Sequence, residues 1–344
     1  MTYQSYQSPY DEVEIKDTDY LVISARIKAM ETRMLTRDKL EQMLEAKEDE
    51  DALKVLTEAG YPPFSMDHPE EMDAALGSVR EELFNDLGDS APDGRYLDIF
   101  KTKYDYHNLK ALLKANVVRT SPDSMLIEMG RVSTQVLKEA LDTGDMSFLP
   151  SMLAEAAVQG KDVLDTTGDP QLSDVLLDKL MFRDQLATAK ATGSDFLTGY
   201  VRIMIDAANL RASVRTLRMS KNAEFLEGVL AEGGEVAPEN FLAVVRGSGA
   251  GLAELFAPTL LAKAAEAGQT AVAGGALTDF EKLCDDAVCE YLADALYVAF
   301  GEAPLVGYLA AVETEITNIR IILMGRNAKI DPDTIRSRLR ATYV

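Results

Sequence analysis

One six-residue pattern occurs three times in this chain: an acidic residue, two spacers, Asn, an aliphatic residue and a basic residue. The copies are DYHNLK at 105–110, DAANLR at 206–211 and the looser EITNIR at 315–320. A pattern that returns at a nearly constant interval indicates one structural unit used three times. The sequence therefore predicts a pseudo-threefold body, which suits a part that surrounds or caps something on an axis better than it suits a single catalytic cleft.

The repeat extends beyond this motif, and helix signals dominate it. Leucines at helical spacing in residues 39–59 align with leucines in residues 136–156, and Thr36 is positioned to cap the first run. The aligned pairs are Leu40 with Leu137, Leu44 with Leu141, and Leu56 with Leu153. A weaker third copy begins at Phe241 and runs through Leu255. We therefore predict an all-α fold of three pseudo-repeats arranged as a pseudo-threefold funnel, divided into a tail at 1–14 and helical repeats at 15–120, 121–225 and 226–344.

Composition excludes several classes of partner and location. The net charge of −22 repels nucleic-acid phosphates and anionic lipid headgroups, so we expect no nucleic-acid partner. Acidic residues, Gly301 and Pro304 interrupt the most apolar stretch, residues 291–312, so no membrane span is expected. The first residues do not have the pattern of a signal peptide, and Cys284 and Cys289 are too far apart around a helix to pair locally. These features predict a cytoplasmic protein with free thiols.

Helical geometry places the acid and Asn of each motif beside the apolar stripe. With Asp206 at 0°, Asn209 lies at about −60° and Leu210 at about 40°. A carboxylate there needs partners, and a basic residue one turn earlier, Arg202 for Asp206 and Lys101 for Asp105, is one candidate. The simplest interpretation is that these side chains fix helix packing. The six proposed structural motif residues are Asp105, Asn108, Asp206, Asn209, Glu315 and Asn318.

Basic residues follow the motif on another side of each helix, at about 120° to 180° from the acid. A recurring basic stripe is unexpected in so acidic a chain. If three such helices surround an axis, the stripes face a shared centre and bind an acidic or polar partner there. The alternative is a solvated face with cations favoured near helix C-termini. The candidate partner-binding residues are Lys110, Lys114, Arg211, Arg215, Arg218 and Arg320.

The sequence offers no catalytic, cofactor-binding or metal-binding constellation. His107 lies inside the first motif copy, but the other copies have Ala208 and Thr317 at that position, which favours a surface histidine; His68 is the only other one. The glycines at 247–251 lack the phosphate-loop lysine. Residues 165–169 are typical of a turn, and the acidic pair at 285–286 lacks a matching second cluster. We therefore predict a protein that is not an enzyme, without a cofactor or metal.

Together these segments resemble the C subunit of prokaryotic V-type (A-type) ATPases, the counterpart of the eukaryotic d subunit. The resemblance rests on YLVISARIKAME near the start, KYDYHNLKALLKA at 103–115, IDAANLRASVRTLRM at 205–219 and the tail from Glu313. It implies an all-helical funnel of three pseudo-repeats without activity of its own. Glu315 is the main departure, since the other two copies have Asp.

The resemblance also implies a function and partners. The family member sits on the cytoplasmic side of the membrane proteolipid ring, receives the tip of the central rotor shaft, and carries torque for ion transport or ATP synthesis. The basic stripe would then form the shaft socket. The alternative is a free-standing all-helical repeat scaffold that binds an unrelated helical partner, and copurification with shaft and ring proteins distinguishes the two.

Overall fold

The predicted all-α class is confirmed by the computed structural model, which describes residues 15–66, 68–118 and 121–344. These residues form α-helices and short 3-10 helices joined by loops, and none of them lies in a strand. Pro62-Pro63 and the glycine-rich segments 233–234, 247–249 and 274–275 all lie outside helices. Helix periodicity in the sequence was therefore sufficient to give the fold class.

The chain divides into two compact units, residues 93–248 and residues 15–92 together with 249–344. Residue contacts are dense inside each unit, and this is what separates the two units. It is a different partition from the three repeats expected at 15–120, 121–225 and 226–344, which stay a prediction.

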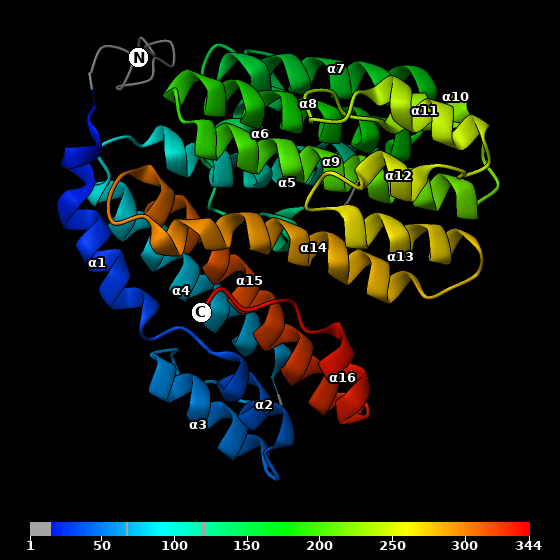
Figure 1. Ribbon diagram of the computed structural model, residues 1–344. Coiled ribbons are helices and arrows are strands. Elements are labelled where there is room, and N and C mark those ends of the chain that lie inside the picture. Colours follow the sequence, from blue (N-terminus) through cyan, green and yellow to red (C-terminus); the bar gives the residue numbers. More distant parts are fainter. Residues whose placement is uncertain (1–14, 67, 119–120) are drawn as a thin grey trace. The chain divides into compact units, whose positions relative to one another are not determined.

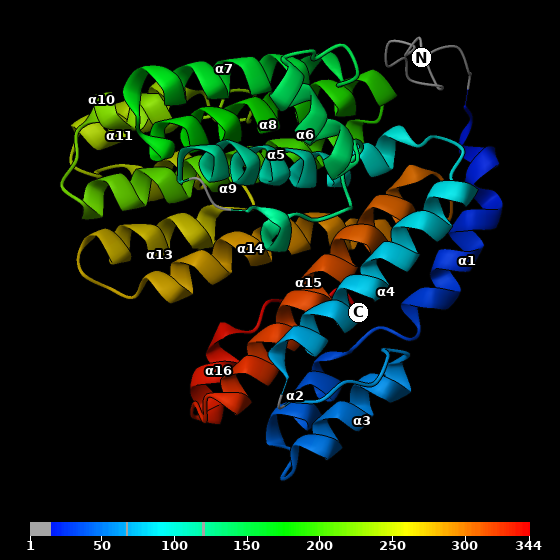
Figure 2. The same cartoon turned by 180° about the vertical axis from the view of Figure 1, so that it is seen from behind.

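The first unit is built around four long helices that run alongside one another, α5, α7, α8 and α9 (Figures 1 and 2). Leu137, Leu153 and Leu177 are fully buried in its core. Ser133, Ser194 and Asn222 each accept a backbone hydrogen bond at a helix start, which satisfies donors that have no partner inside the helix. Its helices are α5 (Arg95–Val118), η2 (Asp123–Met125), α6 (Thr134–Thr143), α7 (Ser151–Thr167), α8 (Pro170–Thr192), α9 (Asp195–Arg218), α10 (Ala223–Val229) and α11 (Pro238–Arg246).

The second unit is organised around α15 (Glu302–Asn327), which packs against α1, α2, α4, α14 and α16. Figure 1 shows α1, α4 and α15 side by side. The N-terminal half of α15 is buried on all sides, which explains its apolar sequence. No helix among the described residues is long and apolar enough to span a membrane. The other helices are η1 (Asp17–Tyr20), α1 (Leu21–Glu31), α2 (Arg37–Glu45), α3 (Asp49–Ala59), α4 (Pro69–Ser90), α12 (Leu252–Phe256), α13 (Ala262–Val272), α14 (Leu277–Ala293), η3 (Asp294–Tyr297) and α16 (Pro332–Arg338).

The order of helices recurs along the chain. Each long motif helix (α5, α9 or α15) follows another long helix (α4, α8 or α14), with the short η3 between α14 and α15, and is followed by a short helix (η2, α10 or α16). The aligned leucine runs fall on α2 and α3 and again on α6 and α7, and Thr36 and Ser133 cap α2 and α6 as the alignment requires. The motif therefore always occupies the same place in a recurring succession of elements.

Candidate functional site

Each motif asparagine binds the backbone of the segment that follows the next short helix. In α5, Asn108 Nδ2 donates to the Ile127 carbonyl at 2.8 Å, and Ile127 N donates to Asn108 Oδ1 at 2.9 Å. Asn209 makes the same pair of bonds with Ala231, at 2.8 and 2.9 Å. Asn318 makes it with Arg340, at 3.2 and 2.8 Å. All three asparagines are at least 98% buried, so each amide satisfies backbone groups that water does not reach.

The first two motif acids bind a backbone amide just before the start of a following helix. Val132 N donates to Asp105 Oδ1 at 3.2 Å, and Val132 immediately precedes Ser133, the N-cap of α6. Val236 N donates to Asp206 Oδ1 at 3.2 Å, and it immediately precedes the N-cap of α11. Asp206 Oδ2 also accepts from Glu235 N at 2.9 Å. Acid and asparagine together fasten the linker that connects one motif helix to the following hairpin.

The third acid makes the equivalent bond at the other end of the sequence. Leu35 N donates to Glu315 Oε2 at 2.5 Å, and Leu35 immediately precedes Thr36, the N-cap of α2. Tyr61 Oη donates to Glu315 Oε1 at 2.6 Å. The bonded position is therefore the same in all three copies, namely the residue before the N-cap of a helix. The order of these contacts is cyclic: the first motif holds the second hairpin, the second holds α11, and the third holds the first hairpin.

Two glycines explain why the third acid is Glu and the others are Asp. A Cβ on Gly130 would lie 2.2 Å from Asp105 Oδ1, and a Cβ on Gly234 would lie 2.0 Å from Asp206 Oδ1. The short aspartate therefore reaches its amide only because a glycine lets the backbone come close. Arg33 occupies the corresponding position, three residues before the N-cap of α2. Glu315, whose side chain is one methylene longer than that of Asp, is the acid of this copy, and we infer that the extra length makes up for the absence of a glycine.

The expected basic partners one turn before each acid are not the ones that the structure uses. Arg131 Nε donates to Asp105 Oδ2 at 2.6 Å, where Lys101 was the candidate. Arg202 pairs with Glu235 at 3.6 Å and not with Asp206. The physical reason is that each acid points away from its own helix into the following linker. Backbone amides and, in the first copy, a linker arginine bind it there. A residue at i−4 lies on the acid's own helix and is not placed to reach that linker.

Arg131 also joins two buried carboxylates in the first unit. Its Nη2 donates to Asp184 at 2.8 Å, and its side chain and those of Asp105 and Asp184 are at most 6% exposed. Tyr106 Oη lies 3.4 Å from Asp184 Oδ2 and donates to it. Burial raises the pKa of Asp105, although Arg131 and the Val132 amide counteract it. This cluster is a set of mutually satisfied buried charges that fixes α5, α8 and the 127–132 linker together.

Asp98, on the first turn of α5, is the group with the clearest expected effect of pH on stability. Burial raises the pKa of its carboxyl from 3.8 to about 6, and Arg131 and Lys101 only partly offset this. The folded chain therefore holds this proton more tightly than the unfolded chain does. Its contribution to stability falls as pH rises from 3.8 towards 6 and stays low above that range.

Replacing Asp98 with asparagine should therefore stabilise the chain at about pH 7.5, with the gain shrinking towards about pH 4, because the ionised form is absent from the variant. Urea unfolding at both pH values measures this difference. The exposed Asp142 of α6 provides the control, Asp142→Asn. A gain that is equal at both pH values would contradict the assignment.

The predicted basic stripe has several partners within the chain. Lys110 pairs with Asp178, Lys114 pairs with Asp174 at 2.5 Å, and Arg320 pairs with Asp73 at 2.9 Å. On α9, Arg215 and Arg218 are exposed and Arg211 is half-buried. Lys110, Lys114 and Arg320 are, like Arg211, partly buried, and the binding of a shaft by this stripe stays a prediction.

Sequence reasoning missed two arginines that hold the first hairpin. Arg326 of α15 donates through Nη1 to carbonyls at the C-terminal end of α2, including that of Ala46 at 2.8 Å, and its Nη2 bonds to Asp49. Arg336 of α16 bonds to Glu41 and Glu45. Cations at a helix C-terminus satisfy unpaired carbonyls and the helix dipole. Their partners lie more than two hundred residues away in sequence, so the only local signal was a positive charge near each helix end.

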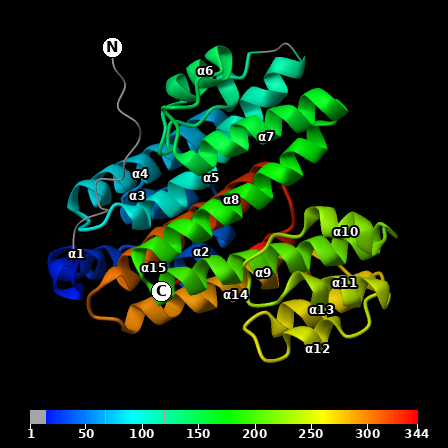
Figure 3. The ribbon, with the colours of Figure 1, turned by 90° about the horizontal axis from the view of Figure 1, so that it is seen from above.

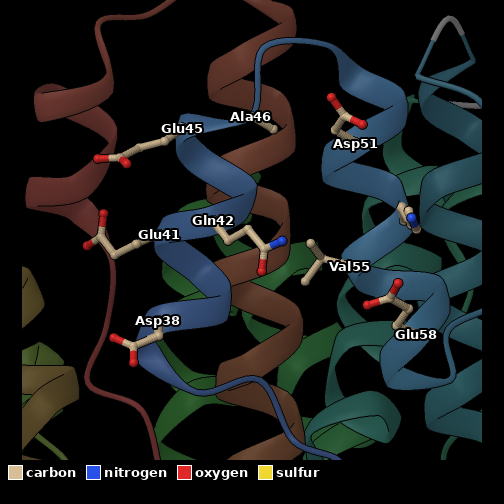
Figure 4. A pocket seen from close by; sticks show the side chains of 9 residues that line it. Asp38, Glu41, Gln42, Glu45, Ala46, Asp51, Val55 and Glu58 are labelled. Atoms are coloured by element: carbon tan, nitrogen blue, oxygen red, sulfur yellow. The ribbon is translucent and has the colours of Figure 1, made fainter.

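A hollow of about 640 Å³ between α2 and α3 is lined mainly by acidic side chains (Figure 4). Lys54 and Gln42 are the other polar side chains in its lining. Glu41 and Glu45 point towards α16, where Arg336 binds both. The lining contains no serine, cysteine or histidine, and it gives no basis for assigning a reaction.

The remaining candidates for chemistry have structural partners. His107 is exposed, with Nε2 at 2.9 Å from the Met125 carbonyl, and His68 lies 3.2 Å from Glu70. The acidic pair at 285–286 binds Arg340, Lys282 and the Ala341 amide. Residues 165–169 end α7 and begin α8. Both cysteines are free, and within the described residues no group of His, Cys, Asp and Glu side chains is arranged to hold a metal ion.

Comparison with known proteins accounts for nearly the whole chain. The family model described as ATP synthase (C/AC39) subunit matches residues 23–338. The V-type sodium ATPase C subunit of Enterococcus hirae is 26% identical over 330 residues, covering 94% of this chain and 99% of that protein. The A-type ATP synthase C subunit of Methanocaldococcus jannaschii is 24% identical, covering 93% of this chain and 86% of that protein. The V-type ATP synthase C subunit of Thermus thermophilus is 26% identical over 222 residues, covering 61% and 68%. A match of this extent shows that the chain belongs to the ATP synthase (C/AC39) subunit family.

Proposed function

We propose that this chain is the central-stalk socket of a rotary V-type ATPase, joining the rotor shaft to the membrane proteolipid ring. It carries out no catalysis, lies on the cytoplasmic side of the membrane, and transmits torque for ion transport or ATP synthesis. Family membership supports its place in a rotary ATPase, and the names of its relatives are those of rotary ATPase subunits.

The observation that carries the proposal is the Glu315–Leu35 contact. Together with the Asp105–Val132 and Asp206–Val236 contacts, it gives every motif helix the same bond to the residue before a helix N-cap in the next predicted repeat. A closed body of three repeats, at 15–120, 121–225 and 226–344, requires that the last repeat also contacts the first. Within each compact unit, these buried, satisfied bonds would pass an applied twist from one segment to the next.

The shaft would enter between the basic stripes. Lys110, Lys114 and Arg320 already have aspartate partners, so an acidic shaft would compete with those aspartates. On α9, Arg215 and Arg218 are exposed and belong to the same stripe, so an acidic shaft would be within their reach. Positive charge on one helix of a chain with a net charge of −22 favours an acidic partner at that place.

The charge reversals Arg215→Glu and Arg218→Glu should together weaken binding of the isolated shaft subunits by about ten-fold or more, because attraction becomes repulsion. Binding is measured by calorimetry, and circular dichroism checks that helicity is kept. The matched control reverses Lys161 and Lys190, two exposed lysines of α7 and α8, and should leave the affinity unchanged. Equal affinity of both double variants would contradict the socket assignment.

A free-standing scaffold is the other candidate for an all-helical repeat chain. Copurification from the native membrane separates the two functions. A rotor socket should copurify with both shaft and ring proteins, and a scaffold should copurify with neither.

A further inference from the structure

A cavity of about 410 Å³ opens between the end of α1, α4 and α15, in the unit formed by residues 15–92 and 249–344. Its volume is in the range of small-molecule sites. The three helices run alongside one another in Figures 1 and 2, and Figure 3 shows α1 beside α15 from above. Residues 59–61, at the end of α3, complete the lining. We call it the Glu315 cavity, because the acid of the third motif lies in its wall.

The walls of the Glu315 cavity are largely apolar. Tyr61 and Tyr308 contribute aromatic rings, which attract cations as well as apolar groups. Two of the aliphatic members are methionines, whose flexible side chains adapt to what they contact. These walls therefore favour a ligand with an apolar body. The aliphatic members are Met30, Met34, Val79, Leu83 and Val312.

Glu315 is a partly buried carboxylate whose hydrogen-bond donors are both uncharged. These donors are the Leu35 amide and the Tyr61 hydroxyl. Among the described residues no base forms an ion pair with Glu315, and Lys39 acts on it only through its charge at longer range. The corresponding acid of the first motif has an arginine partner, Arg131. Because a buried charge is stable mainly when it is paired, Glu315 favours a positive group in the cavity.

The other charges around the Glu315 cavity also favour a cation. The carboxylates in its lining are those of Glu82, Asp86 and Glu315. Arg33 is the base in this described lining, and Arg26 of α1 pairs with Asp86 from beside it. Glu82 is exposed and lies one turn before Asp86 on α4. Negative charge therefore exceeds positive charge at the cavity, and the net charge of −22 on the chain further concentrates cations near it.

We propose that the Glu315 cavity binds a small organic ammonium ion with an apolar body. A carboxylate offers about four acceptor positions, and the Leu35 amide and the Tyr61 hydroxyl use two of those on Glu315. The ammonium group donates to the positions that remain, in a charge-assisted hydrogen bond, and the apolar body lies against the methionines. An anion would be repelled at this site, and a neutral apolar molecule would lack the bond to Glu315.

Titration calorimetry of the full-length chain with n-hexylammonium chloride tests this proposal. We expect saturable binding of one ion per chain. Hexan-1-ol has the same apolar body without the charge, and it should bind about ten-fold more weakly or less, because a hydrogen bond to a charged group is lost. Equal affinity for the two compounds would overturn the proposal, and so would the absence of saturable hexylammonium binding.

Two variants show whether the ion binds in the cavity. Val79→Trp fills the cavity from α4 and should abolish binding, and circular dichroism checks that the variant is folded. Glu82→Gln removes one exposed carboxylate of the lining and should weaken binding by about two- to five-fold. The matched control, Glu58→Gln, removes the same charge from the hollow between α2 and α3 and should leave the affinity unchanged. If folded Val79→Trp binds like the wild type, or if the control weakens binding as much as Glu82→Gln, the proposal is wrong.

Hydrogen exchange of the Leu35 amide provides an independent readout, because the carboxylate that binds the ion also holds this amide. With hexylammonium at ten times its dissociation constant, exchange at Leu35 should become roughly ten-fold slower, since the ion binds only the folded arrangement. The Val236 amide, which Asp206 holds in the other unit, serves as the reference and should not change. Exchange at Leu35 that stays the same when the ion is bound would overturn the contact with Glu315.

Discussion

Replacing Gly234 with alanine should destabilise the first unit by about 3 kcal/mol or more, because it displaces a buried, hydrogen-bonded carboxylate. The added Cβ would lie 2.0 Å from Asp206 Oδ1 and 2.8 Å from its Cγ. Asp206 then has to leave the amides of Glu235 and Val236, which lose their acceptor. Hydrogen exchange of these amides measures the local effect, and urea unfolding measures the loss of stability.

Gly228→Ala is the matched control. Gly228 lies in α10 in the same unit, and a Cβ there would have nothing within 4 Å. Alanine at this helical position should stabilise the chain by up to about 1 kcal/mol. If both substitutions change stability alike, the close approach of Gly234 to Asp206 has no energetic role and the account of the Asp–Gly pairing is wrong.

Replacing Glu315 with alanine should loosen the attachment of the first hairpin to α15, with a loss of about 3 kcal/mol, because two donors lose their acceptor in a buried site. Leu35 and Tyr61 are at most 6% exposed, so water does not readily replace the carboxylate. Hydrogen exchange at the Leu35 amide and the first turn of α2 should become faster. This local measurement is suitable because a chain with two compact units need not unfold in one step.

Conservative variants show whether reach or charge governs the Glu315 contact. Glu315→Asp should be nearly as damaging as alanine, since a side chain one methylene shorter does not span the gap that Arg33 imposes in place of glycine. Glu315→Gln keeps one acceptor oxygen and should lose about half as much stability. If hydrogen exchange of the Leu35 amide is unchanged in both Glu315→Ala and Glu315→Asp, the contact between Glu315 and the Leu35 amide would be contradicted.

Local patterns in the sequence predict the helical class and the place of the motif in each succession of helices. Thr36 and Ser133 cap equivalent helices, and the aligned leucines fall on equivalent hairpins, because these features depend on neighbours a few residues away. The rotation of Asp206 and Asn209 towards the buried side also follows from helical geometry alone.

The partners of the motif could not be predicted, because they are set by tertiary contacts. Leu35 is the amide that meets Glu315 across 280 residues, and no spacing rule links the two. A usable signal was present for the first two copies, where a glycine lies three residues before each hairpin, at Gly130 and Gly234. Such a glycine indicates a close approach of the backbone only when the aspartate that binds beside it is already known.

A density map of the chain bound to its shaft subunits tests the central claim most directly. We predict that α5, α9 and α15 are related by an approximate threefold rotation and that the shaft tip lies on their common axis, next to the basic stripes. A map in which these helices have no rotational relation, or in which the shaft binds the outer surface, would contradict the rotor socket.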